Sequence, residues 1–236
     1  MGDGMNTRSK LRIDISKLTI PDFKLAESLS AGEKSELLTL LNTSYPHFGY
    51  NHIFDNYPCY KHLYVFRLRL NNTLVASRQL LIVDELYKSP AWAIEMNDVL
   101  QTQRFAIGSR AIVHPFLRGQ GLGSKLVQMV NQEAYSNHGV EAIFGSSTNM
   151  GAISLYLQRG AKLWKDDIQK LNPDQTSLAN NIHLEILFKK INNPQARMSS
   201  PLRYVYRNET ANYNEKWNPS LYTLDTHQTA ETYMAV

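Results

Sequence analysis

Residues 111–124, AIVHPFLRGQGLGS, decide how the rest of the chain is interpreted. The apolar segment before them predicts a strand that breaks at Pro115, and a glycine-rich turn then leads into a helix. Glycine allows a positive φ and lets a ligand approach the main chain without meeting a Cβ atom. The free N–H groups and the positive dipole end of the helix point back at this turn. The stretch therefore predicts a cradle for an anion, best suited to a phosphate or a diphosphate.

Composition excludes several classes of protein. The chain has 236 residues, of which 43% are hydrophobic and 19% charged, as in an ordinary globular protein. A net charge of +4 suits an anionic ligand, but no dense Lys/Arg stripe favours nucleic acid. Cys59 is the only cysteine, so an intramolecular disulfide and a cysteine metal cluster are excluded. No apolar run approaches the roughly 20 residues that span a bilayer, so we expect no membrane partner. A single cysteine fits a reducing cytoplasm, where we expect the protein, and we expect no metal.

A second motif follows about thirty residues later, at residues 149–161, NMGAISLYLQRGA. It has an Asn, an Ala three positions on and a Tyr seven positions on, and its Gly comes where a predicted helix gives way to a strand. Together with RGQGLG, and with Val113 and Pro115 just upstream, this stretch resembles the GNAT N-acetyltransferase superfamily. The first motif fits that superfamily's R/Q-x-x-G-x-G/A signature.

The resemblance implies an α/β (α+β) fold. Its sheet would be mixed, largely antiparallel and six- to seven-stranded, with splayed parallel central strands and helices on both faces. Apolar patterns predict strands at 11–20, 63–70, 74–86, 104–113, 141–146, from 161, and 182–190. They predict helices at 31–43, within 87–103, at 121–137 and at 149–159.

Three regions are expected along the chain. Residues 1–10 form a flexible tail, 11–191 the acyltransferase domain, and 192–236 an aromatic-rich extension that packs on the domain or a partner subunit. Pro194, Ser199, Ser200 and Pro201 give the start of the extension the look of a linker. The extension and the 87–103 insertion are candidate surfaces for a homodimer. Residues 44–62, rich in Tyr, Phe and His, read either as a loop packed on the core or as part of an acceptor pocket.

The resemblance also implies the co-substrate, acyl-CoA, with acetyl-CoA first. The arm that carries the thioester would run between the strands ending at Val113 and Ser146, and the Val113 amide would face the thioester carbonyl. Asn149 would bond the arm or simply cap its helix, and Tyr156 would protonate the leaving thiolate. The residues expected to bind the co-substrate are Ile112, Val113, Arg118, Gly119, Gln120, Gly121, Leu122, Gly123, Ser124 and Asn149.

The sequence does not identify the base that would take a proton from the amine. The strand at 104–113 contains no acid, which leaves Glu95, Asp98, His114, a water chain or an amine that arrives neutral. The first hypothesis is acetyl transfer to the primary amine of a small molecule. A protein acceptor, a long-chain acyltransferase and a non-catalytic acyl-CoA sensor stay open beside it.

Overall fold

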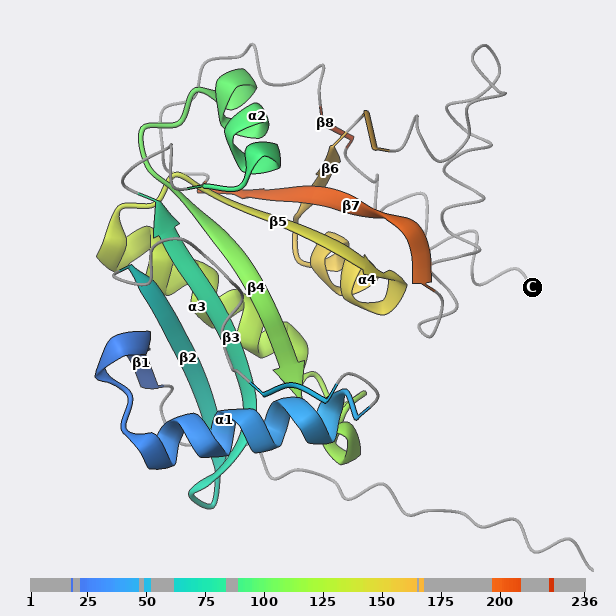
Figure 1. Ribbon diagram of the computed structural model, residues 1–236. Coiled ribbons are helices and arrows are strands. Elements are labelled where there is room, and N and C mark those ends of the chain that lie inside the picture. The colour runs from blue at the N-terminus through green and yellow to red at the C-terminus, as the bar shows by residue number, and fades with distance from the viewer. Residues whose placement is uncertain are drawn as a thin grey trace, which may run out of the picture.

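One mixed sheet organises the molecule (Figure 1), seen in a computed structural model. The structure describes residue 18 and residues 22–46, 49–51, 62–83, 89–164, 166–167, 197–208 and 221–222. The strands lie in the order β1-β2-β3-β4-β5-β7-β6-β8. Only β4 and β5 run parallel; every other neighbouring pair is antiparallel. The bounds are β1 Asp22–Leu25, β2 Leu63–Leu70, β3 Thr73–Val83, β4 Phe105–Val113, β5 Ala142–Asn149, β6 Lys162–Trp164, β7 Arg197–Arg207 and β8 Leu221–Tyr222.

Helices cover both faces of this sheet, as expected. The helices α1 (Ala31–Ser44) and α2 (Ala91–Leu100) bury one side against a core that contains Phe105 and Phe144. The helices α3 (Leu122–His138) and α4 (Met150–Gln158) pack on the opposite face against Leu80 and Ile143. The predicted fold class is confirmed, and the described residues form eight strands, of which β1, β7 and β8 lie outside the predicted ranges. None of the helices in the described residues is long and apolar enough to cross a membrane.

Local sequence explains where these elements begin and turn. Ser30 and Glu33 form a capping box that starts α1, with reciprocal hydrogen bonds of 3.2 and 2.8 Å. Asn71 and Asn72 both take positive φ between β2 and β3, as a tight hairpin turn requires. Gly139, also at positive φ, ends α3.

The central parallel pair separates partway along its length. β4 and β5 pair only through Phe105–Ala142, Ala106–Ile143 and Ile107–Phe144, and then diverge (Figure 1). On the other side of β4, Arg110 and Ala111 together stand opposite the single residue Arg78. This is a β-bulge, and Arg110 adopts a φ of 44° in it. We call the unpaired wedge between residues 108–113 and 145–149 the fork, and its closed end the apex.

The start of the C-terminal extension belongs to the sheet. β7 pairs with β5 over most of its length and with β6 on its other edge. The linker interpretation of Ser199, Ser200 and Pro201 is therefore wrong. Small and proline residues indicated a loop, but the alternation of Leu202, Tyr204 and Tyr206 supplies a buried strand face directly after them. The predicted strand at 182–190, the domain boundary at 191 and most of the predicted strand at 11–20 lie outside the described residues.

Candidate active site: a glycine cradle and a strand fork

The glycine turn has the open shape that an anion cradle needs. Gly119 and Gly121 adopt φ values of 76° and 81°, and a Cβ atom on either would meet nothing within 4 Å. Gly121 is also the N-cap of α3, where it supplies no side-chain acceptor, and the first turn has no acidic residue. No side-chain cap and no acid of the first turn therefore meets the positive dipole end of α3.

The first turn of α3 closes one side of the cradle. A Cβ on Gly123 would stand 3.2 Å from Leu155 of α4, so glycine permits the two helices to approach here. The Ser124 hydroxyl is buried and has no hydrogen-bond partner in the described part of the chain. A buried donor of this kind is usually satisfied, so it favours a ligand oxygen at this turn.

Arg118 fastens the cradle to the rest of the fold. Its Nε donates to the Val113 carbonyl at 3.1 Å and its Nη2 to the Ser44 carbonyl at 3.2 Å. Its guanidinium also lies 5.9 Å from the ring centre of Tyr45. Arg118 thus ties the turn to the end of β4 and to the last residue of α1, while the fold leaves the glycine amides clear.

Backbone polar groups line the fork. His114 donates its amide to Val75 of β3 at 2.9 Å, so the neighbouring Val113 amide points away from β3 and toward the fork. Residues 108–113 and 145–149 contain no acidic side chain. Ser146 is exposed and its successors in β5 are half-buried, so solvent reaches this part of the sheet. An extended ligand placed here would meet main-chain donors and acceptors rather than carboxylates.

Tyr156 lies near the apex in an aromatic cluster. It is buried, and its ring stacks on Tyr204 of β7 at a centroid distance of 4.3 Å. Tyr206 packs edge-on at 6.3 Å and donates its hydroxyl to the Tyr156 carbonyl at 3.1 Å. Arg78 of β3 lies 5.8 Å from the Tyr156 ring centre. The sequence predicted Tyr156 but none of the partners that hold it.

The tyrosines of β7 are weak acids in this setting. Burial raises the pKa of Tyr204 well above its ordinary value, and the positive charge of Arg78 opposes that rise. Burial likewise raises the pKa of Tyr206. Both β7 hydroxyls therefore stay protonated at neutral pH.

Asn149 and the candidate bases have other partners. The Asn149 side chain caps α4 by accepting the Ala152 amide at 2.9 Å. Glu95 is ion-paired with Arg203 at 2.8 Å. Asp98 is an exposed residue of α2, and the His114 ring lies against Phe116 at 5.6 Å. The structure brings none of Glu95, Asp98 and His114 into contact with Tyr156.

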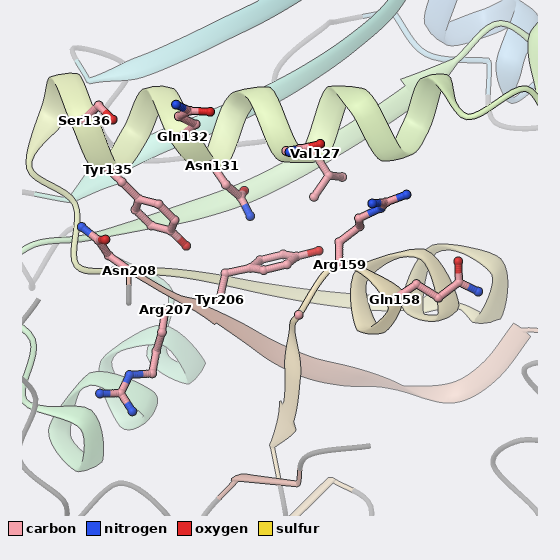
Figure 2. A pocket seen from close by; sticks show the side chains of 12 residues that line it. Val127, Asn131, Gln132, Tyr135, Ser136, Gln158, Arg159, Tyr206, Arg207 and Asn208 are labelled. Atoms are coloured by element: carbon pink, nitrogen blue, oxygen red, sulfur yellow. The ribbon is translucent and has the colours of Figure 1, made fainter. Parts of the chain in front are cut away.

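A cavity of about 570 Å³ lies away from the cradle, at the other end of α3 (Figure 2). In Figure 2, Asn131 and Tyr135 project from α3 toward Tyr206 on β7, with Arg159 at the end of α4. Asn131 also accepts a hydrogen bond from Arg78, so this inner wall of the cavity belongs to the apex cluster. The cavity therefore lies behind the apex, on the closed side of the fork.

Sequence reasoning missed Arg78, Gly108, Gly145 and Tyr204. Arg78 has the same strand parity as Leu80 and Ile82, so a charge on an apolar face was the available signal. Tyr204 alternates with Leu202 and Tyr206, which is a strand pattern, but the preceding residues were interpreted as a linker and the pattern was not used. The two glycines could not be placed at the apex before the register of β4 and β5 was known.

Comparisons with known proteins found one family model and a set of solved structures. The family model described as the acetyltransferase (GNAT) family matches residues 34–161. No curated protein matches the sequence. Similar solved structures include an aminoglycoside acetyltransferase from an uncultured soil metagenomic sample in complex with trehalose (19% identity, 62% of this chain and 89% of that chain, TM-score 0.46). They also include an acyl-CoA N-acyltransferase from Pseudomonas aeruginosa (18% identity, 61% and 87%, TM-score 0.45). A Bacillus subtilis acetyltransferase in complex with CoA matches at 18% identity over 80% of this chain and 99% of that chain, with a TM-score of 0.46.

Proposed function

This chain belongs to the acetyltransferase (GNAT) family, and we propose that it transfers an acetyl group directly from acetyl-CoA to a primary amine of a small molecule. The observation that carries the proposal is the fork. Two parallel strands stop pairing after Ile107 and Phe144, and a glycine cradle lies at the end of the strand that diverges. An extended tether with a diphosphate at one end fits both features.

The cradle would hold the diphosphate of the co-substrate. The main-chain amides of residues 118–124 and the Ser124 hydroxyl supply donors without a side-chain acceptor in the way. The dipole of α3 adds a favourable field for a negative charge. Arg118 serves this site by fastening the turn, since its side chain is bonded to Val113 and Ser44.

The arm would pair with the open edge of β4 through Ile112 and Val113, which changes one expected role. Gly108 and Val113 are separated by five residue steps, or roughly 17 Å of strand at about 3.3 Å per residue. Tyr156 lies with Arg78 at the Gly108 end. Val113, beside the cradle, therefore suits the arm, and the thioester belongs near the apex. In this proposal the Val113 amide pairs with the arm, whereas the resemblance alone would place it opposite the thioester carbonyl.

Tyr156 would supply a proton to the leaving group. The neutral amine attacks the thioester carbonyl carbon, a C–N bond forms, and the carbonyl π electrons move to oxygen. When that pair returns, the C–S bond breaks, its electrons leave on sulfur, and the Tyr156 hydroxyl protonates the thiolate. The strand segments 108–113 and 145–149 that border the fork contain no carboxylate, so the amine arrives neutral or is deprotonated by water. After attack the nitrogen is positively charged; it gives one proton to water, and the Tyr156 phenolate left by protonation of the sulfur takes a proton back from water.

The test is release of free thiol from acetyl-CoA against a panel of acceptors. Small primary amines, lysine-containing peptides and an amine-free control form the arms, and a long-chain acyl-CoA replaces acetyl-CoA in a parallel series. We expect release only with small amines and acetyl-CoA. Release only with peptides, or only with the long-chain donor, would move the assignment to a protein or long-chain acyltransferase. Tight CoA binding without release from any acceptor would identify a sensor instead.

A further inference from the structure

Arg78 is a fully buried cation without a counter-charge in the described part of the chain. Its side chain is 0% exposed at the centre of the sheet. Nη1 donates to the Asn131 side-chain oxygen at 2.9 Å, and Nη2 is buried with no hydrogen-bond partner. The other groups around it are the tyrosine rings of the apex cluster, with Tyr156 at 5.8 Å and Tyr206 at 5.9 Å. Aromatic faces offset only part of the cost of removing a guanidinium from water.

The unpartnered nitrogen lies against the apex of the fork. A Cβ placed on Gly108 would stand 2.6 Å from Arg78 Nη2. Gly108 is the first residue of β4 after the last β4–β5 pair. A side chain at this position would press on the guanidinium, so glycine lets Arg78 lie against β4 beside the opening.

A matching arrangement exists on the other strand. A Cβ on Gly145, the first residue of β5 after the last pair, would overlap the hydroxyl end of Tyr204. Tyr204 stacks on Tyr156. The glycines at the two sides of the apex thus admit a cation from β3 and a phenol from β7, with Tyr156 beside them. Arg78 of β3, Tyr204 of β7 and Tyr156 of α4 therefore lie together at the closed end of the fork.

We propose that this apex is an anion-stabilising site, and that Arg78 is a catalytic residue that holds the sulfur of CoA as a thiolate while the C–S bond breaks. This inference rests on the proposed function, which brings the thioester to the apex. In the step described above, the electron pair of the C–S bond leaves on sulfur, and Arg78 Nη2 donates to that sulfur until Tyr156 delivers its proton. A fixed donor aimed at developing charge, in a site shielded from water, contributes strongly because it does not need to reorganise.

Charge requirements favour this role over a purely structural one. Elsewhere in the described chain, the buried guanidinium of Arg203 lies against Asp167 at 2.7 Å and Glu95 at 2.8 Å. Among the described residues, the partners of Arg78 are a neutral amide and aromatic rings. A thiolate formed during turnover supplies the missing negative charge at the moment when it is needed.

The experiment measures the ionisation of CoA bound to the full-length protein, with no acceptor present. The ultraviolet absorbance of the thiolate is followed against pH for the wild type, for Arg78→Met and for Arg78→Lys. We expect the wild type to lower the pKa of the bound thiol, and Arg78→Met to raise it by about one unit or more relative to the wild type. Arg78→Lys keeps the positive charge but loses the planar set of guanidinium N–H donors, so the pKa of the bound thiol should lie between those two. It also serves if the Met variant does not fold.

Arg67→Met is the matched control, because it removes a second fully buried guanidinium from the opposite face of the sheet. It should leave the bound thiol as in the wild type. Turnover should separate the variants too: kcat of Arg78→Met falls about 100-fold while KM for acetyl-CoA changes little. An unchanged thiol pKa in both Arg78 variants would overturn the thiolate site alone. Failure of the wild type to bind CoA would remove the proposed function and this site together.

Discussion

Two arginines are completely enclosed by the same sheet, and their surroundings differ in one respect. Arg67 on β2 is 2% exposed and is ion-paired with Asp22 and, at 2.7 Å, with Glu33 of α1. Arg78 on β3 is 0% exposed and meets only neutral groups in the described residues. The charge of Arg67 is neutralised by carboxylates of the protein itself. The charge of Arg78 would be neutralised only by an anionic ligand. A buried cation with acids of its own indicates a structural contact, and one without them at an unpaired edge of a sheet indicates a binding site.

The Arg67 region also shows what such a pairing does to its acids. The pKa of Glu33 is lowered to about 2, first by the Ser30 amide, then by Lys24 and Arg67. The same carboxylate closes the capping box of α1. Glu33 therefore joins the helix start, β1 and β2, and its contribution is to stability rather than to chemistry.

Tyr156→Phe should have the largest effect, and it should fall on activity. The ring and its stacking on Tyr204 are kept while the proton that neutralises the thiolate is lost. We expect kcat to fall about 100-fold or more, with CoA affinity and the unfolding midpoint unchanged. Steady-state thiol release and calorimetric binding of CoA check this. Wild-type turnover in the variant would rule Tyr156 out as the acid.

Replacing each buried arginine with methionine tests directly whether Arg67 contributes more to stability than Arg78. Arg67→Met removes the buried cation between Asp22 and Glu33 and leaves them only the half-exposed Lys24, so it should cost about 2–3 kcal/mol of unfolding free energy. Arg78→Met removes a buried charge that has no ion partner in the described part of the chain, and should change stability by less than about 1 kcal/mol in either direction. Urea unfolding of the two variants measures both. Equal losses would show that Arg78 is a structural group like Arg67.

Acid should weaken the Arg67 region specifically. Because the folded-state pKa of Glu33 lies below its ordinary 4.5, its contribution is complete above pH 4.5 and is lost as the pH falls toward 2. We expect Glu33→Gln to lower stability by about 1–2 kcal/mol at neutral pH, and the gap from the wild type to narrow below pH 4.5. If the difference in unfolding free energy between Glu33→Gln and the wild type were constant from neutral pH to pH 2, the charge of the Glu33 carboxylate would not contribute to stability.

Asn149→Ala gives the smallest expected effect. The side chain caps α4 through the Ala152 amide, so its loss should cost about 1 kcal/mol of stability. KM for acetyl-CoA should rise less than about threefold, since the capping oxygen is already engaged. A much larger rise, with little loss of stability, would instead assign Asn149 to binding the arm.

Most helices and turns of the fold could be predicted from the sequence, because short-range interactions determine where each of them begins. The capping box at Ser30, the asparagine turn at Asn71 and the glycine turn at 119–123 use short-range chemistry, and all three were predicted or follow from local pattern. β7 was misread because Ser199, Ser200 and Pro201 weaken the signal just before its buried face begins. The apex could not be predicted at all, since Arg78, Gly108, Gly145 and Tyr204 come from four strands that meet only through the register of the whole sheet.

Amide hydrogen exchange on the full-length protein, with and without acetyl-CoA, tests the central claim most directly. If the cradle and the fork hold the co-substrate, protection should appear in residues 108–125 and 145–149, where the main chain has unpaired groups. The exchange rates of the β2 amides around Arg67 should not change. Protection confined to the residues around the cavity at the far end of α3, with the glycine turn and the open strands exchanging as before, would contradict the account.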